Sequence, residues 1–309
     1  MTKKPRAFAV VNPNSANGST EQEWDAIHAA LEAALGELDF GFTQAVGDAA
    51  NVARRAVKAG HELIISVGGD GTNNEIVNGM FEHGAPINPR ARLGFVCCGT
   101  GGDLRRTLGV PKDLRQACEV LVRGNTRRID LGRFSFFDHS GRRAERYFIN
   151  ITSFGIGGEI DARVNRTTKV LGGFASFLWA SFASVVDYRN KPVELTVDGN
   201  PIEPRRIFNV AVANGRCFGG GMQVAPDADP ADGLFDVVLI GDLTKLEVVT
   251  QMTRIYSGRH LSHPKVEVLR ARRVEAHSDE IVLLDVDGEQ PGRLPATFEI
   301  VPAALDVIV

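Results

Sequence analysis

The chain has 309 residues, of which 43% are hydrophobic and 24% charged, as in ordinary soluble globular proteins. This length suffices for two domains that each bury a core. A formal net charge of −3 argues against a nucleic-acid partner, since such proteins carry a broad basic face. The four cysteines show no C-x-x-C spacing and no signal peptide is evident, which predicts a cytoplasmic protein with reduced thiols.

Alternating strand and helix signals fill the first 125 residues. Apolar runs predict strands at residues 6–12, 39–43, 62–67 and 93–97. Thr20 and Glu23 form a capping-box signature for a helix through Leu35, and Asp48 is placed to cap a second helix. The alternation predicts an α/β domain over residues 1–125, with a parallel sheet covered on both faces.

After residue 125 the pattern changes to strands joined by hairpin signals. Strands are predicted at residues 126–137, 144–154, 192–197, 206–213, 234–240, 265–274 and 280–286. The dipeptides Asp198-Gly199 and Asp287-Gly288 are typical of two-residue hairpin turns. Because few helical signals interrupt these strands, we expect an all-β antiparallel sandwich domain over residues 126–303.

Two glycine-rich turns follow the third and fourth predicted strands. The first, residues 66–72, opens a helix, and the second spans residues 98–103. Glycines leave the backbone N–H groups open to a ligand, and a helix start attracts anions. Parallel strands end at the same edge of a sheet, so one phosphate ligand can contact both turns. The alternative is a plain strand-to-helix turn, because short glycine motifs occur by chance.

The most apolar stretch of the chain is at residues 170–186. It lies at the lower margin of length for spanning a bilayer of about 30 Å. One interpretation is a buried helix of the second domain. The other is a surface whose Phe174, Phe177, Leu178 and Trp179 line an acyl-chain pocket or touch a membrane.

The loop at residues 226–236 holds four aspartates. This density of oxygen ligands suits Mg²⁺ or Ca²⁺, although the spacing is not that of an EF-hand. A solvated acidic loop is the alternative. His260 and His263 form a close pair, but no third ligand lies at a recognisable spacing, so we interpret both as surface or loop residues.

Taken together, these motifs resemble the diacylglycerol kinase catalytic-domain family. The resemblance is carried by Gly-Gly-Asp-Gly-Thr, Gly-Thr-Gly-Gly-Asp, Gly219-Gly220-Gly221-Met222, the acidic loop and Asp287-Gly288-Glu289, in this order along nearly the whole chain. It implies an ATP-dependent lipid kinase with a first domain like that of NAD kinases and phosphofructokinases. It also implies that residues 304–309 return to the first domain.

The resemblance assigns roles residue by residue. The implied ATP contacts are Asn12, Pro13, Asn14, Ser15, Ala16, Thr43, Ser66, Val67, Gly68, Gly69, Asp70, Gly71, Thr72 and Thr100. Asp70 would organise the nucleotide-bound Mg²⁺ with support from Asp130, and Glu289 would be the general base. An ordinary exposed hairpin glutamate is the alternative for Glu289. A second, structural Mg²⁺ would bind Asp229, Asp232 and the Leu234 carbonyl.

Two positions depart from the family pattern. Ala16 stands where the family usually has glycine, and Gly102 where it usually has asparagine, so weaker nucleotide binding is expected.

The sequence leaves three hypotheses for the function: a kinase for a diacylglycerol-like or sphingoid-like lipid, a soluble-substrate kinase of the NAD kinase type, and a non-catalytic nucleotide- or lipid-binding protein. The first implies peripheral contact with the inner membrane face. The sequence leaves a homodimer open.

Overall fold

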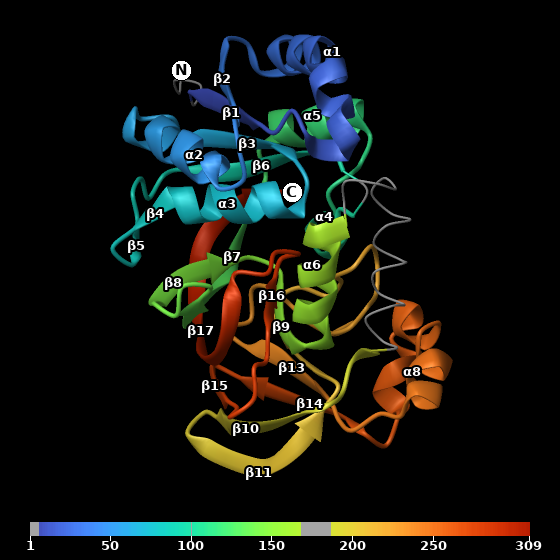
Figure 1. Cartoon of the computed structure of the whole chain (residues 1–309). Helices are drawn as coiled ribbons and strands as arrows, with labels where there is room; N and C mark the ends of the chain where they lie inside the picture. The colour runs from blue at the N-terminus through green and yellow to red at the C-terminus, as the bar shows by residue number, and fades with distance from the viewer. Residues whose placement is uncertain (1–5, 100, 168–186) are drawn as a thin grey trace. The chain divides into compact units, whose positions relative to one another are not determined.

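The computed structural model describes residues 6–99, 101–167 and 187–309 (Figure 1). The chain forms two compact units, Met1–Ile129 with Ala303–Val309, and Asp130–Pro302. The first contains a parallel sheet with helices, and the second is built mainly of antiparallel strands. The predicted fold class is therefore confirmed.

The first unit is organised around a five-stranded parallel sheet, in the order β17-β6-β3-β1-β2. Its strands are β1 (Ala7–Val11), β2 (Leu38–Phe42), β3 (Leu63–Gly68), β6 (Arg92–Cys97) and the end of β17 (Gly292–Ile308). Its helices are α1 (Ser19–Leu35), α2 (Asp48–Lys58), α3 (Asp70–Met80), α4 (Asp103–Leu108) and α5 (Leu114–Arg123), with the short elements η1 (Ser15–Gly18), β4 (Phe81–Glu82) and β5 (Ala85–Pro86). Alternate residues of β1 and β3 form one core with α1 and α5. On this face, burial of the apolar surface holds the helices against the sheet.

Two helix starts differ from their local sequence signals. Helix α1 begins after the left-handed Gly18 without a side-chain cap, and the Thr20 hydroxyl bonds to Ser15 instead. Asp48 is the first residue of α2 and is not its N-cap. The Glu75 carboxylate accepts hydrogen bonds from the N–H groups of residues 47 and 49 and satisfies that helix start. Both capping predictions were wrong: the Thr20 hydroxyl is bonded to Ser15 within the preceding turn, and the start of α2 is satisfied by Glu75 from α3.

The second unit contains two sheets that share a core. One has the strands β11 (Asn200–Ile207), β10 (Lys191–Val197), β15 (Arg273–His277), β17, β7 (Thr126–Asp138) and β8 (Arg143–Phe148). The other has the order β14 (Val266–Ala271), β13 (Phe235–Ile240), β12 (Asn209–Ala213), β9 (Ile151–Gly155) and β16 (Leu284–Val286). The unit's helical elements are α6 (Ile156–Thr167), α8 (Lys245–Gln251), η2 (Arg254–Ser257) and η3 (Arg259–Ser262). Phe148 stacks on Phe235 and Phe154 on Phe298, at centroid distances of 5.5 and 5.9 Å, so aromatic rings join the two sheets.

Three predicted strands are each two strands in the structure. The runs at residues 144–154, 206–213 and 265–274 divide into β8 and β9, β11 and β12, and β14 and β15. Each pair is separated by one or two residues, and its members belong to different sheets. Both members are apolar toward the shared core, so periodicity does not reveal where the chain changes sheets.

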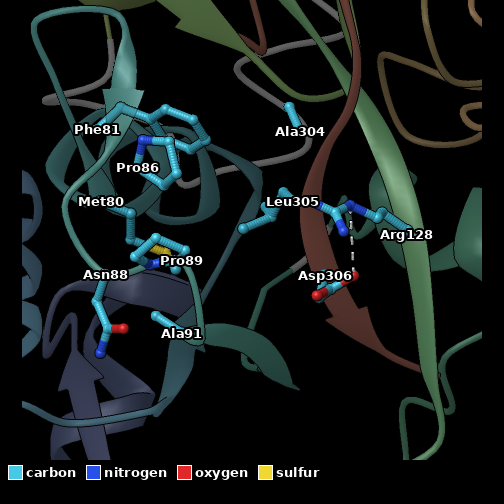
Figure 2. A pocket seen from close by; sticks show the side chains of 10 residues that line it. All are labelled: Met80, Phe81, Pro86, Asn88, Pro89, Ala91, Arg128, Ala304, Leu305 and Asp306. Carbon is cyan, nitrogen blue, oxygen red and sulfur yellow. Dashed lines mark ion pairs between the residues drawn. The ribbon is translucent and has the colours of Figure 1, made fainter.

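A small cavity of about 30 Å³ lies in the first unit, beside the end of β17 (Figure 2). Met80, Pro86 and Leu305 are among the residues that line it. Arg128 also lines it, donates to the Ala303 carbonyl at 2.8 Å and lies 3.9 Å from the Asp306 carboxylate. The volume suits water and is far too small for a nucleotide, so we assign no substrate to it.

The apolar stretch at residues 170–186 lies outside the described residues, so both of its interpretations stay predictions. In the part of the chain that the structure describes, no helix has the length and apolar character needed to cross a bilayer.

Candidate functional site

The first glycine turn lies between β3 and α3. Gly69 precedes α3, and among the described residues a Cβ added there would meet no atom within 4 Å. A Cβ on Gly68 would instead lie 2.6 Å from the Thr72 hydroxyl, so only glycine fits that position. The turn therefore leaves open space beside the positive end of an 11-residue helix, the arrangement that binds phosphate groups in many proteins.

Asp70 joins the first glycine turn to the second. Its two carboxylate oxygens accept hydrogen bonds from the backbone N–H groups of Asp103 and Leu104, at 2.9 and 3.2 Å. The Cys98 N–H also donates to the Gly68 carbonyl at 3.0 Å. The two turns thus meet at one edge of the sheet, as the sequence predicted, and the Asp70 side chain caps α4. The predicted contact of Asp70 with Mg²⁺ stays a prediction.

The loop after β1 is tied to the same turn. The Asn12 side-chain amide donates to the Thr72 hydroxyl at 3.0 Å. The Asn12 side-chain oxygen accepts the Asn14 N–H at 3.1 Å, and the Asn12 backbone carbonyl accepts the Ser15 hydroxyl at 2.9 Å. Thr43 follows β2 directly, and its N–H donates to the Val11 carbonyl at 2.8 Å. The loop after β1 and the two glycine turns are therefore connected to one another within the first unit.

The predicted contacts at Ser66, Val67 and Thr100 stay predictions. Ser66 and Val67 lie inside β3 with buried side chains, and the Ser66 hydroxyl has no hydrogen-bond partner among the described residues. Thr100 lies outside the described residues, so its predicted contact stays a prediction.

Both departures from the family pattern occupy the left-handed region. Ala16 has φ of 53° and Gly102 has φ of 64°. Glycine adopts this conformation freely, whereas a Cβ adds strain. Gly102 therefore fits its position at the start of α4, and Ala16 is the strained residue of the pair.

In the second unit, Glu289 follows a two-residue turn at Asp287 and Gly288. Both turn residues have positive φ, and Val286 and Glu289 exchange backbone hydrogen bonds of 2.8 and 2.9 Å. The predicted hairpin is confirmed. The Glu289 side chain is 28% exposed, and its carboxylate lies 3.9 Å from the Arg146 guanidinium. The turn therefore presents a carboxylate that is neither fully solvated nor buried.

Asp287 anchors this turn. Its carboxylate accepts the backbone N–H groups of residues 149, 150 and 151, at 2.9–3.2 Å. An aspartate that receives three N–H groups is fixed in place. We did not assign Asp287 this role from the sequence, because its partners are more than a hundred residues away.

A pair of buried acids lies behind the turn. Asp285 accepts the Gly288 N–H and the Ser153 hydroxyl, both at 3.1 Å, and is in hydrogen-bond contact with Asp161 of α6. Burial, reinforced by the Asp285 charge, raises the pKa of Asp161 well above its ordinary value, and burial raises the pKa of Asp285. Two carboxyl groups in this contact share a proton. No local sequence pattern indicates this pair.

The acidic loop is held by its own backbone and by two other strands. Asp229 and Asp232 accept the N–H groups of residues 231 and 234, both at 3.0 Å, and Asp232 is paired with Arg270. Asp130 is buried and accepts the Gly233 N–H at 2.7 Å, which ties it to this loop. Among the described residues, no group of three or more His, Cys, Asp or Glu side chains is placed to hold a metal ion. A cation at Asp232 would have to compete with the Arg270 guanidinium.

Comparisons with known proteins agree with these features. Residues 6–134 match the diacylglycerol kinase catalytic domain, and residues 150–309 match the YegS C-terminal NAD kinase beta sandwich-like domain. A diacylglycerol kinase from Staphylococcus carnosus is 30% identical over 296 residues, covering 96% of this chain and 92% of the relative. One from Staphylococcus aureus is 29% identical over 306 residues, covering 98% and 92%.

Solved structures show the same fold. A diacylglycerol kinase from Bacillus anthracis has a TM-score of 0.70 at 22% identity, covering 100% of this chain and 98% of the other. An NAD kinase from Archaeoglobus fulgidus in complex with ATP has a TM-score of 0.51 at 15% identity, covering 98% and 93%. The fold is thus that of the NAD kinase-like proteins. Within it, this chain belongs to the diacylglycerol kinase family, as its motifs indicated.

The strain at Ala16 predicts a stabilising substitution. We expect Ala16→Gly to raise the free energy of unfolding by about 1 kcal/mol, because glycine adopts the left-handed region without Cβ strain. Urea unfolding measures the change. Asn17→Gly, at φ of 59°, is the matched control and should gain less, since asparagine tolerates this region. A gain no larger than that of the control would contradict the assignment of strain.

The buried acid pair predicts a pH dependence of stability. The folded pair holds a proton that the unfolded chain releases above about pH 4, so the free energy of unfolding falls as pH rises from there. Asp161→Asn keeps a donor toward Asp285 and removes the titration. We expect the free energy of unfolding of the variant to exceed that of the natural chain at pH 8 and to equal it near pH 4. The difference at pH 8 should be about 1.4 kcal/mol for each pH unit by which folding raises the pKa of the pair.

Urea unfolding at several pH values tests this expectation. Asp279→Asn replaces an exposed acid of the same unit and should leave the pH dependence unchanged. Identical pH slopes for Asp161→Asn and the natural chain would show that the pair does not share a proton.

Proposed function

We propose that this protein is an ATP-dependent lipid kinase that transfers the γ-phosphate to a hydroxyl of a diacylglycerol-like or sphingoid-like lipid. Membership of the diacylglycerol kinase family supports the reaction class. The observation that carries the proposal is the Asp70 bridge, which brings two glycine turns together beside the open N-terminus of α3.

The first unit supplies the phosphate site in this proposal. The backbone N–H groups at residues 69–72 would hold the nucleotide phosphates, and Asn12 would keep Thr72 in place through its 3.0 Å hydrogen bond. Mg²⁺, when bound with the nucleotide, neutralises charge on the phosphate oxygens. Asp70 is the carboxylate best placed to face that cation, because it already lies between the two turns. The Mg²⁺ site at Asp229, Asp232 and Leu234 stays a separate prediction.

Glu289 of the second unit would act as general base. It would accept the proton of the lipid hydroxyl while that oxygen forms its bond to the γ-phosphorus and the bond to the β-phosphate oxygen breaks, releasing ADP. The support is local geometry: a carboxylate on a rigid two-residue turn, anchored by Asp287 and partly open to solvent. The Arg146 guanidinium lies 3.9 Å from this carboxylate.

Removal of the base should strongly reduce turnover without removing the nucleotide site. We expect Glu289→Gln to lower kcat by about 10²- to 10⁴-fold with little change in ATP affinity. The measurement is transfer of labelled γ-phosphate from ATP with Mg²⁺ to a panel of lipids in mixed micelles, beside NAD as a soluble acceptor. Glu280→Gln, an exposed acid of the same unit, is the control. Unchanged turnover would remove the assignment of Glu289.

The same assay separates the alternatives. Label recovered in an organic-extractable product supports the lipid kinase, and label on NAD supports the soluble-substrate kinase. Binding of ATP without transfer to any acceptor would support a non-catalytic protein.

The open space beside Gly69 predicts a loss of ATP binding without a loss of stability. Gly69→Ala introduces a methyl group that meets no atom of the described residues within 4 Å, so the free energy of unfolding should change by less than about 0.5 kcal/mol. The same methyl would occupy the proposed phosphate position and weaken ATP binding at least about tenfold. Calorimetric titration with ATP measures the affinity. ATP binding equal to that of the natural chain would place the phosphates elsewhere.

A further inference from the structure

An exposed apolar stripe runs along α8 and η2 of the second unit. Leu246 is 74% exposed, Val249 54%, Met252 41% and Tyr256 45%. These residues are spaced by three, three and four positions, so they lie on one side of the helical segment. We call them the α8 stripe. Scattered apolar residues are normal on a protein surface, but an aligned set marks an interaction site.

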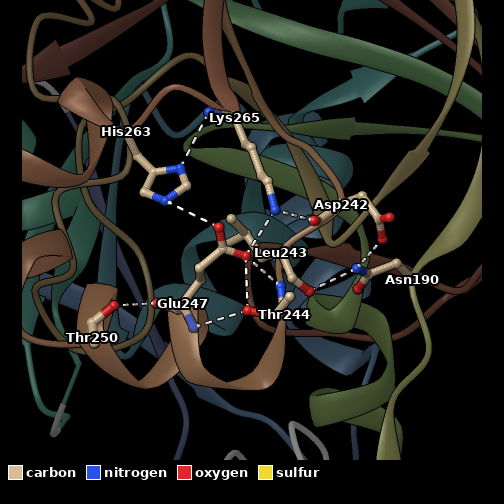
Figure 3. A network of polar contacts seen from close by, with 8 residues as sticks. All are labelled: Asn190, Asp242, Leu243, Thr244, Glu247, Thr250, His263 and Lys265. Carbon is tan, nitrogen blue, oxygen red and sulfur yellow. Dashed lines mark hydrogen bonds and ion pairs between the residues drawn. The ribbon is translucent and has the colours of Figure 1, made fainter.

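The polar side of α8 faces the protein instead. Figure 3 shows Lys265 and His263 directed at Glu247, whose carboxylate lies 2.8 Å from the ammonium and 3.8 Å from the imidazole. Glu247 also accepts the N–H and hydroxyl of Thr244, which completes a capping box. The Lys265 ammonium, with these two bonds, lowers the pKa of Glu247 to about 2. The carboxylate is therefore charged at neutral pH, and the helix is fixed through its polar face.

The segment before α8 is fixed as well. The Asn190 amide donates to the Asp242 carboxylate at 2.6 Å and to the Leu243 carbonyl at 2.9 Å. Leu243 and Val248 are the apolar residues that this segment buries in the unit. A surface helix normally buries its apolar stripe and exposes its polar residues. In α8 the arrangement is reversed: Leu246 and Val249 are exposed. Polar contacts such as that of Glu247 with Lys265 hold the helix against the unit.

The charge of this segment is positive. Residues 244–265 carry Lys245, Arg254, Arg259 and Lys265 against the single acid Glu247, in a chain whose formal net charge is −3. Arg254 and Arg259 are exposed, and neither forms an ion pair within the described part of the chain. The exposed apolar stripe is thus accompanied by cationic side chains that are available to an anionic partner.

We propose that the α8 stripe is a docking surface for an anionic lipid bilayer. Apolar side chains beside arginine, with tyrosine at the end, form the pattern of helices that lie in a membrane interface. Leu246, Val249 and Met252 enter the boundary of the acyl chains, and Arg254 and Arg259 contact the anionic headgroups. The proposal rests on the proposed function, because a lipid acceptor is dissolved in the bilayer that this surface would bind. It differs from the membrane interpretation of residues 170–186.

Vesicle flotation with the full chain tests the proposal. The vesicles contain phosphatidylcholine alone or with phosphatidylglycerol, and we expect binding to require the anionic lipid and to weaken with added salt. The double variant Leu246→Ser/Val249→Ser should lose at least about tenfold in vesicle affinity. Arg254→Gln and Arg259→Gln should each lose about fivefold on anionic vesicles only. Ile281→Ser, at 57% exposure in the same unit, is the matched control and should bind normally.

Kinase activity separates this proposal from the proposed function. The stripe variant should keep its activity on a short-chain acceptor dissolved in water and lose it on the same headgroup embedded in anionic vesicles. If no lipid accepts phosphate, the proposed function fails, and flotation still decides the docking surface. Vesicle binding unchanged by the stripe variant would overturn the proposal. So would a dimer of the natural chain that the same variant converts to monomers, because the stripe would then join two copies.

Discussion

The Asp70 carboxylate is the contact on which the first unit's site depends. Helix α4 is only six residues long and starts at a left-handed glycine without a side-chain cap of its own. Asp70 satisfies two of its N–H groups and thereby holds the second turn beside the first. A phosphate beside this carboxylate is repelled unless a cation lies between them. That repulsion is the physical reason to propose Mg²⁺ with the nucleotide.

The second unit uses carboxylates in two different ways. Asp287 is buried and saturated with backbone N–H groups, and Asp285 shares a proton with Asp161, so both stabilise the turn. Glu289 extends beyond them with a partly exposed carboxylate. A buried acid that is fully hydrogen-bonded cannot accept a substrate proton easily, whereas a partly solvated one can. The division of roles therefore follows from burial and hydrogen bonding.

The sequence predicted the elements that local patterns encode. Alternation of apolar residues located most strands, and the glycine turns and the Asp287-Gly288 hairpin were found where expected. Contacts between distant residues left no such pattern. The Glu75 carboxylate caps α2 through the N–H of Ala49, which lies 26 residues earlier in the chain. Asp161 of α6 is in hydrogen-bond contact with Asp285 of β16. The sheet changes near residues 149, 208 and 272 were missed because a core-facing strand is apolar in either sheet.

The two departures from the family pattern do not argue equally for a non-catalytic protein. Gly102 adopts the left-handed conformation that its position requires, so replacing an asparagine there removes a side-chain amide but adds no strain. Ala16 is strained, yet an alanine retains the backbone N–H that a glycine would offer. Strain at one residue costs about 1 kcal/mol and lowers stability before it removes a contact. The departures therefore affect how firmly the loops are held more than whether they can bind phosphate.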